Sequence, residues 1–251
     1  CNPESPEHWF RREWILQPEK HNALHIHLTM DDNPALDEKI KQRYINTYEG
    51  VFKKRYIDGE WVMAEGLVYR FTPEDCEEFA PYDDEVCYVS IDYGITNPFA
   101  ALMWCVRDGV AHCFDEWGHD SKQEGYRLTD SELYDGLQAW IGNRNVAEIV
   151  IDPSASSFIE EIDRHGRFYA QKANNDVIDG IQRTQRGLQS GAVKIGVRCA
   201  ETRKEFGLYL WDEKASKRGE DAVVKQNDHY MDSMRYFVNT VGRDIVPELS
   251  D

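Results

Sequence analysis

Acidic side chains recur at three places in the sequence where a metal ion could be bound. Asp92 ends the run VCYVSID, Val86–Asp92, which is rich in residues that favour strands. Asp152 ends a similar run, Glu148–Asp152. A third segment, Asn227–Tyr236, holds two aspartates four residues apart with a histidine between them, namely Asp228, His229 and Asp232. These segments are the strongest candidates for one shared site, with Asp92 at its centre.

Carboxylates held on rigid elements suit hard divalent cations such as Mg²⁺ or Mn²⁺, which take oxygen ligands and leave positions for water and phosphate. Two such ions about 4 Å apart can activate a water and stabilise a leaving oxygen in phosphodiester hydrolysis. Each residue alone also has an ordinary explanation: a turn for Asp92, a helix cap for Asp152, a helix start for Asp228 and a surface position for His229. We expect a metal site because all of them fall at one predicted edge.

The segments between these residues predict how they meet. We expect an antiparallel meander of three strands at residues 86–92, 99–106 and 110–117. The capping box Thr129–Glu132 opens a helix that runs to Gly142, and residues 148–152 form the fourth strand. Further helices are expected at 154–164, 176–190, 201–213 and 227–241, with short strands at 168–172 and 192–196.

This order of elements is that of an α/β protein with the RNase H-like fold, in which a mixed central sheet of three antiparallel strands and then parallel strands is flanked by helices. The helix at residues 129–142 supplies the crossover that makes the fourth strand parallel to the first. Asp92 and Asp152 would then lie at adjacent carboxyl ends. The last helix would bring Asp232 to the same edge.

The first part of the chain has a different pattern. Residues 1–20 carry an amphipathic helical pattern, and Leu24–Met30 alternates strictly between apolar and polar residues, which predicts a half-buried strand. Asn33-Pro34 predicts the start of a helix that ends by Gly50. We place a boundary near residues 58–66. The expected domains are residues 1–60, a linker or the tail of a preceding domain, and residues 61–251.

Composition and charge limit the possible functions. The apolar fraction of 41% is that of a globular protein, no apolar run is long enough to cross a membrane, and the six cysteines form no CxxC pair. The net charge of −17 opposes general nucleic-acid binding. Residues 164–218, however, carry six more basic than acidic side chains. We expect four of these to line a DNA approach to Asp92: Arg183, Arg186, Lys194 and Arg198.

Three motifs resemble the nuclease motifs of the large terminase subunit of tailed bacteriophages: SIDYG at Ser90–Gly94, VIDPS at Val150–Ser154 and NDHYMDSMRY at Asn227–Tyr236. Asp58–Tyr69 resembles the segment leading into that nuclease domain. Cys1–Phe10 resembles the end of the family's ATPase domain. The resemblance implies an endodeoxyribonuclease of the RNase H-like fold that cuts concatemeric viral DNA during genome packaging, in the cytoplasm of the infected bacterial host.

By this resemblance, Asp92, Asp152 and Asp232 would be metal ligands for two Mg²⁺ or Mn²⁺ ions. His229 would be an accessory metal or phosphate contact, and Asp228 matches the motif with a less defined role at the metal. The implied partners are double-stranded DNA, the ATPase domain of the same polypeptide, the phage portal and the small terminase subunit, with no membrane. The chain lacks a GxxxxGK[ST] phosphate loop, so we expect no ATPase activity from it.

Three other classes of protein stay open on the sequence alone. The turn Asp92-Tyr93-Gly94-Ile95-Thr96 fits the phosphate-binding DxGxT pattern of the actin and sugar-kinase group, which would make this a nucleotide-binding protein. An RNase H-like transposase or resolvase would share the metal chemistry. A non-catalytic docking domain on a capsid or motor would tolerate loss of any of the carboxylates, so metal-dependent cleavage would exclude it.

Overall fold

The computed structural model describes residues 1–72, 75–94 and 98–250, which form two compact units. The first unit comprises Cys1–Val68 together with Tyr209–Lys225, and the second comprises Tyr69–Leu208 together with Gln226–Asp251. Among the described residues, no helix has the length and apolar character needed to span a membrane.

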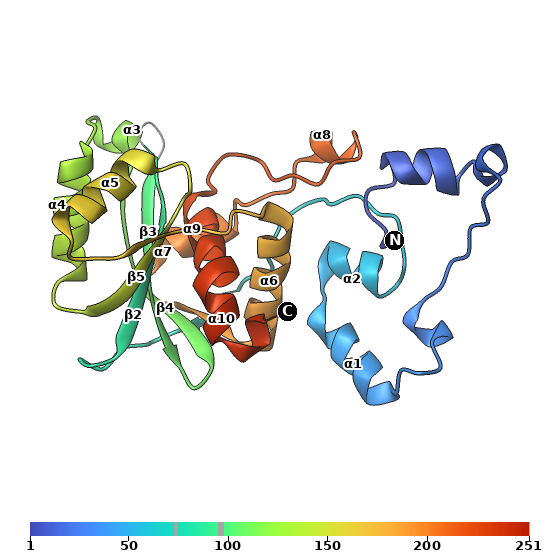
Figure 1. Ribbon diagram of the computed structural model, residues 1–251, viewed down its shortest axis with the longest axis horizontal. Coiled ribbons are helices and arrows are strands. Elements are labelled where there is room, and N and C mark those ends of the chain that lie inside the picture. The colour runs from blue at the N-terminus through green and yellow to red at the C-terminus, as the bar shows by residue number, and fades with distance from the viewer. Residues whose placement is uncertain (73–74, 95–97, 251) are drawn as a thin grey trace. The chain divides into compact units, whose positions relative to one another are not determined.

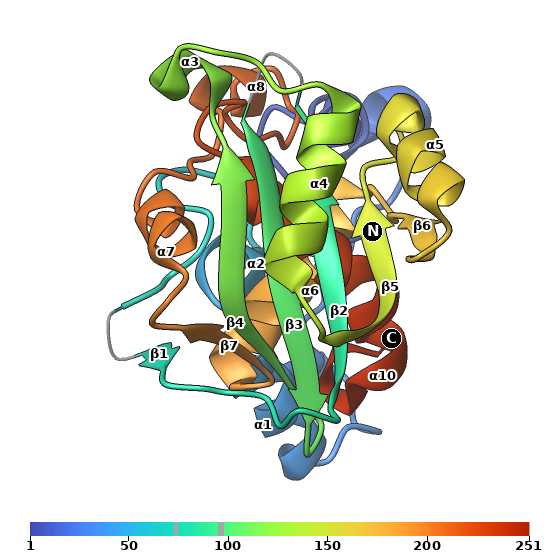
Figure 2. The same ribbon diagram turned by 90° about the vertical axis from the view of Figure 1, so that its left-hand side faces the viewer.

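The second unit is built on one seven-stranded sheet, whose middle strands are labelled in Figure 1. The strand order is β1-β7-β4-β3-β2-β5-β6, which can be followed across Figure 2. The strands are β1 Cys76–Glu77, β2 Val86–Asp92, β3 Phe99–Arg107, β4 Val110–His119, β5 Asn145–Ile151, β6 Ala170–Lys172 and β7 Val193–Gly196. β2, β3 and β4 form the expected antiparallel meander, and β5 lies parallel to β2. β6 is parallel to β5, and β7 is parallel to β4. The predicted mixed sheet is therefore present, and β2 lies inside it.

Helices cover both faces of this sheet (Figure 2). On one face, α4 (Asp130–Ile141) and α5 (Ser156–His165) pack Leu137, Phe158 and other apolar side chains against the alternate residues of β2 and β3. The opposite face holds α9 (His229–Phe237), whose Phe237 stacks on Trp104 of β3 with ring centroids 4.3 Å apart. Because β2 is buried on both faces, it holds its last residue rigidly.

α6 (Val177–Ser190) packs on α9 and β7, and the other helices of the second unit are short: α3 Ser121–Glu124, α7 Ala200–Phe206 and α10 Arg243–Ile245. α9 continues directly into a π-helical turn, Val238–Gly242. The predicted helix at residues 201–213 is thus too long, because α7 ends at Phe206. The chain then enters the first unit, where Leu210 forms a bridge to Leu67.

The first unit contains α1 (Glu38–Thr47), α2 (Gly50–Tyr56) and α8 (Glu213–Ser216). Residues 209–225 belong to this unit through several contacts, including a hydrogen bond from the Ser5 hydroxyl to the Ser216 carbonyl oxygen at 2.7 Å and an ion pair between Arg55 and Asp221. The buried guanidinium of Arg55 also donates to the carbonyl oxygen of Val62, 3.1 Å away.

The predicted strand at Leu24–Met30 is wrong. Residues 24–29 have no regular secondary structure, and the apolar members of the alternation are exposed: Leu24 by 84%, Ile26 by 64% and Leu28 by 69%. Alternation predicts which side chains share a face, but a strand also needs a neighbouring strand to satisfy its backbone. Helical structure in this part of the chain consists of a short segment at residues 9–15, which is π-helical from Arg11, and a 3-10 turn at Pro18–His21.

Candidate active site

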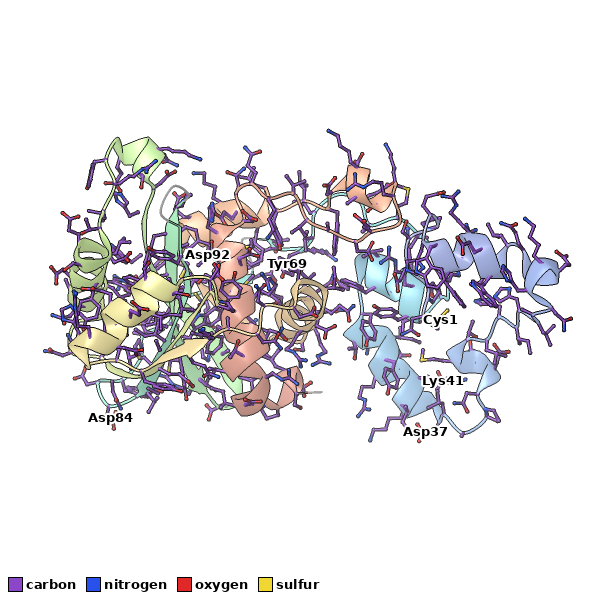
Figure 3. The ribbon with its side chains drawn as sticks, turned by 45° about the horizontal axis from the view of Figure 1, so that its top comes forward. Cys1, Asp37, Lys41, Tyr69, Asp84 and Asp92 are labelled. Atoms are coloured by element: carbon purple, nitrogen blue, oxygen red, sulfur yellow. The ribbon has the colours of Figure 1, made fainter. Side chains whose placement is uncertain are left out.

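The carboxyl ends of β2 and β5 bring Asp92 and Asp152 together. Asp92 is the last residue of β2, at the end of the strand away from Asp84, which precedes its first residue (Figure 3). Asp152 directly follows β5, and its backbone N–H donates to the carbonyl oxygen of Ile91, 3.2 Å away. The side chain of Asp152 accepts a hydrogen bond from the Ser154 N–H at 2.8 Å. The predicted adjacency of the two aspartates is therefore present.

Small polar residues set α9 close against β2. The hydroxyl of Ser233 donates to the carbonyl oxygen of Ser90 at 2.9 Å. The Ser90 hydroxyl in turn accepts the indole N–H of Trp104 at 2.9 Å. Both serines are completely buried, so every polar atom in this contact needs a partner inside the protein. The contact holds the helix beside the strand that ends in Asp92.

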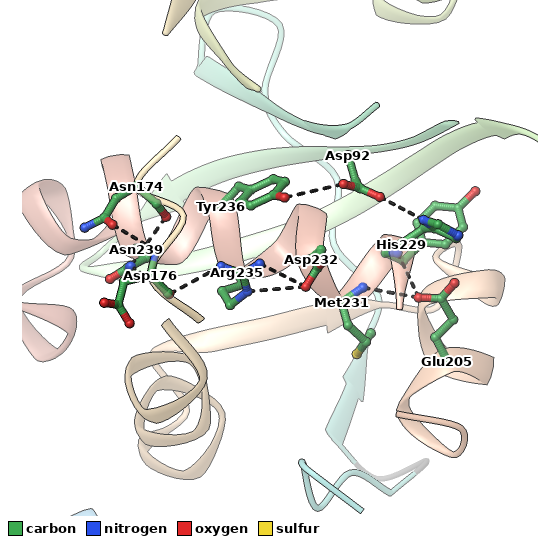
Figure 4. A network of polar contacts seen from close by, with 11 residues as sticks. Asp92, Asn174, Asp176, Glu205, His229, Met231, Asp232, Arg235, Tyr236 and Asn239 are labelled. Carbon is green, nitrogen blue, oxygen red and sulfur yellow. Dashed lines mark hydrogen bonds and ion pairs between the residues drawn. The ribbon is translucent and has the colours of Figure 1, made fainter. Parts of the chain in front are cut away.

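Two side chains of α9 bind the carboxylate of Asp92 (Figure 4). The Nδ1 atom of His229 lies 2.8 Å from Oδ2 of Asp92, and the hydroxyl of Tyr236 donates to Oδ1 at 3.5 Å. Because each carboxylate oxygen has a partner from the same helix, the orientation of Asp92 depends on where α9 lies.

The pKa of Asp92 is raised above its ordinary value. Burial is the main cause, since only 9% of the residue is exposed. The hydrogen bond from His229 opposes the shift, whereas the negative charges of Asp232 and Asp152 add to it. The two other predicted aspartates therefore lie near enough to Asp92 to repel its ionised form.

The pKa of His229 is also raised. Burial of the imidazole, the largest single influence, disfavours the charged ring, but the hydrogen bond to Asp92 and the surrounding carboxylates outweigh it. One of these carboxylates is Glu205 on α7, whose own pKa is raised to about 7, mainly by burial. The site thus concentrates negative charge around a single imidazole.

Asp232 is held by its neighbour on the next turn of α9. The guanidinium of Arg235 donates to Oδ1 of Asp232 from Nη2 at 3.0 Å and from Nε at 3.3 Å. Arg235 is 1% exposed, and its Nη1 donates to the carbonyl oxygen of Asp176 at 3.3 Å. A Cβ on Gly180 would lie 2.5 Å from Cγ of Arg235, so only glycine lets α6 pack this closely on the arginine stem.

Asp228 lies immediately before α9, where a capping residue is expected, but its side chain makes no capping hydrogen bond. The residue is buried, and its charge contributes to the raised pKa of both His229 and Glu205. Its place in the predicted metal site is therefore beside His229.

The structure does not bring the four predicted DNA-binding residues to this edge. Arg183 is buried, with Nε donating to Asn239 Oδ1 at 3.1 Å and Nη1 donating to the Leu249 carbonyl, so the prediction for it is wrong. The guanidinium of Arg186 donates to the carbonyl oxygen of Ser250 at 2.8 Å. These two arginines hold the C-terminal segment against α6.

Lys194 and Arg198 lie along β7 and just after it. Strand register places Lys194 level with Cys87, near the beginning of β2 and about 16 Å along the strand from Asp92. Arg198 is exposed, and its Nη2 lies 3.7 Å from Oδ2 of Asp115. Counting charges along the sequence could not reveal that the basic residues face different parts of the unit.

The donors at this sheet edge are of the chemical kind that a divalent cation takes. Oxygen ligands from Asp92, Asp152 and Asp232 approach one sheet edge, and a bound cation would relieve the repulsion that raises the pKa of Asp92. In the part of the chain that the structure describes, no three ligand groups are already close enough to hold a metal ion. The side chains of the aspartates would therefore have to turn toward a cation as it binds.

Three residues that hold the predicted ligands or their helix in place were not predicted from the sequence. Arg235 could have been found, because it lies three residues after Asp232 on one helix. Tyr236 was part of the quoted motif, but its bond to Asp92 depends on the packing of α9. Glu205 gave no sequence signal, since its partners are backbone groups of a distant helix. Ile95 and Thr96, on which the DxGxT alternative depends, lie outside the described residues.

Comparison with solved structures finds close similarity to large terminases. The large terminase of a thermophilic bacteriophage, in complex with ADP, is 41% identical over 96% of this chain and 61% of its own, with a TM-score of 0.90. The same phage protein in complex with ATP-gamma-S gives 41% identity, 96% and 62% coverage, and a TM-score of 0.90. The nuclease domain of the P22 large terminase is 19% identical over 73% of this chain and 99% of its own, with a TM-score of 0.56. No family model and no curated protein matches the chain.

A mixed sheet whose central strands deliver carboxylates to one edge defines an RNase H-like protein, and the likeness to the P22 domain shows this fold, as predicted. The chain spans about three fifths of the length of the thermophilic-phage terminase that it matches (61% in the ADP complex). Its 41% identity over nearly its whole length makes it a member of the large terminase family, which confirms the family resemblance seen in the sequence.

Proposed function

We propose that this chain is a metal-dependent endodeoxyribonuclease that cuts concatemeric viral DNA during genome packaging. The observation that carries the proposal is the gathering of Asp92, Asp152 and Asp232 at one edge of an RNase H-like sheet, in a member of the large terminase family. Asp92, Asp152 and Asp232 would hold two Mg²⁺ or Mn²⁺ ions. When bound, such ions activate water for attack on phosphorus and stabilise the leaving oxygen.

The side chains around the aspartates would prepare the site before substrate arrives. His229 and Tyr236 fix the orientation of the Asp92 carboxylate through its two oxygens. Arg235 fixes Asp232 and partly offsets its charge. Burial of Asp92 and Asp232 keeps bulk water from their carboxylates, so these repel one another strongly until cations bind.

Double-stranded DNA is the proposed substrate, met in the cytoplasm of the infected host. By family membership, the ATPase domain of the same polypeptide, the portal and the small terminase subunit are proposed partners. ATP hydrolysis is assigned to the rest of the longer polypeptide, because this chain has no phosphate loop.

Nicking of supercoiled plasmid tests the proposed reaction. We expect cleavage with Mn²⁺ and none with EDTA, and we expect Asp92→Ala, Asp152→Ala and Asp232→Ala each to reduce the rate by more than tenfold, about 1.4 kcal/mol of transition-state stabilisation. Asp163→Ala is a matched control, because Asp163 is exposed on α5 outside the site. A variant that retains more than a tenth of the wild-type rate would remove that aspartate from the site, and an inactive wild type would count against the function.

Thermal unfolding tests metal binding without relying on cleavage. A cation that binds only the native site stabilises it by about 2.7 kcal/mol at one hundred times its dissociation constant. We expect Mn²⁺ to raise the Tm of the wild type and of Asp163→Ala, and to leave the Tm of Asp92→Ala nearly unchanged. Equal shifts in all three proteins would mean that the ion binds elsewhere.

A further inference from the structure

The first turn of α9 is capped by a residue from another helix. The Oε2 atom of Glu205, on α7, accepts the backbone N–H of Tyr230 at 2.8 Å and that of Met231 at 3.2 Å (Figure 4). The first N–H groups of a helix have no acceptor within the helix, and a negative charge at this end is favourable. Glu205, a residue of another helix, therefore accepts the hydrogen bonds that the residue before a helix usually accepts.

α7 is itself capped from the sheet in the same way. Oε1 of Glu116, on β4, accepts the Glu201 N–H at 2.7 Å, while Oε2 accepts the Thr202 N–H at 3.0 Å and the Thr202 hydroxyl at 2.6 Å. Two carboxylates in series thus connect β4 to α7 and α7 to α9. The turn of α9 that Glu205 caps begins with His229, and the imidazole of His229 binds Asp92.

We propose that Glu205 is a positioning residue for the active site: it fixes the first turn of α9 so that His229 reaches Asp92 and Asp232 faces the same sheet edge. Glu116 supports this role by fixing α7. The catalytic part of the inference rests on the proposed nuclease function, whereas the structural part does not.

Stabilisation of the helix end alone does not explain why the carboxylate of Glu205 is buried. Glu205 is only 8% exposed, and burial raises its pKa to about 7 against the opposing effect of its two backbone hydrogen bonds. Asp228 occupies the residue position from which a helix is normally capped, yet its side chain does not cap α9. Capping from α7 ties α9 to a second element, which a local cap cannot do.

Three variants test this role. Glu205→Ala removes the acceptor, while Glu205→Gln keeps an oxygen that can accept both N–H groups. Thr129→Ala is the matched control, because the Thr129 hydroxyl caps α4 on the opposite face of the sheet by accepting the Glu132 N–H. The readouts are the ring signals of His229 in NMR spectra, assigned with His229→Gln, and the rate of Mn²⁺-dependent plasmid nicking at saturating Mn²⁺.

We expect Glu205→Ala to shift the His229 ring signals and to lower the maximal nicking rate by roughly ten- to one-hundredfold, the usual effect of losing a residue that orients a metal ligand. Glu205→Gln should remain within a few fold of wild type, and Thr129→Ala should leave both readouts unchanged. Unchanged His229 signals in Glu205→Ala, or equal shifts in Thr129→Ala, would overturn the positioning role.

Two further outcomes separate this inference from the proposed function. If the wild type does not nick DNA, the function fails and the His229 signals alone decide the positioning role. If Glu205→Ala does not fold, Glu116→Ala takes its place: we expect a smaller shift of the same His229 signals, and no shift would refute the connection from β4 through α7 to α9.

Discussion

Replacing Arg235 with methionine should strongly destabilise the sheet-containing unit. Methionine keeps an unbranched apolar stem against Gly180 but removes the guanidinium that binds Asp232. Arg235 and Asp232 are both buried, 1% and 6% exposed. Removing one partner of a buried ion pair costs roughly 3–5 kcal/mol, because the remaining charge keeps its desolvation penalty. Domains of 150–250 residues lose about 2–4 °C of Tm per kcal/mol, so we expect a decrease of about 10 °C in EDTA.

A double-mutant cycle shows whether the ion pair is the cause. Asp232→Asn combined with Arg235→Met removes the charge at both positions. The free energy of unfolding of the double variant should therefore be about 2 kcal/mol higher than the sum of the two single changes predicts. Urea unfolding monitored by tryptophan fluorescence supplies the free energies. A loss below about 1 kcal/mol for Arg235→Met, or strictly additive effects, would refute the view that Arg235 offsets the charge of Asp232.

Three further changes have defined outcomes. Ser90→Ala leaves the Trp104 indole N–H without its 2.9 Å acceptor in a fully buried place and should cost about 1–3 kcal/mol in urea unfolding; an unchanged midpoint would contradict it. Gly196→Ala would place a Cβ 2.9 Å from a β4 carbonyl oxygen and should cost about 1–3 kcal/mol, unless β7 can shift. The hydrogen bonds from Arg107 lower the folded pKa of Glu85 from 4.5 to about 2, so its contribution to stability is present above pH 4.5 and lost as the pH falls toward 2. The stability difference between wild type and Glu85→Gln should therefore shrink over that interval, and a constant difference would contradict the assignment.

The central sheet and the meeting of its aspartates could be predicted from the sequence, because their causes are local. The run Val86–Asp92 coincides with β2, and Thr129 and Glu132 form the expected capping box at the start of α4. The element order is that of the RNase H-like fold, in which the fourth strand lies beside and parallel to the first, and the helix before it supplies the crossover that a parallel neighbour needs. Periodicity, element order and chain connectivity together brought Asp152 beside Asp92.

The remaining features depend on contacts that local patterns do not contain. The alternation at Leu24–Met30 resembles a strand, but the described residues supply no neighbour for it. The charge of Arg183 suggests a surface, whereas its bonds to Asn239 and Leu249 place it inside. Glu205 acts on backbone N–H groups, which every residue except proline has, so no residue type marks its partner in advance.

The division of the chain between the two units has a practical consequence for making fragments. The polypeptide passes from one unit to the other three times, after Val68, Leu208 and Lys225. A recombinant fragment starting at Tyr69 would still carry residues 209–225 but would lose Leu67 and Arg55, which pair with Leu210 and Asp221. Trp211 and Val223, both buried in the intact chain, would lose part of their cover and favour aggregation. Replacing residues 209–225 with a glycine-rich linker between Leu208 and Gln226 would remove these exposed apolar residues from a fragment of the sheet-containing unit.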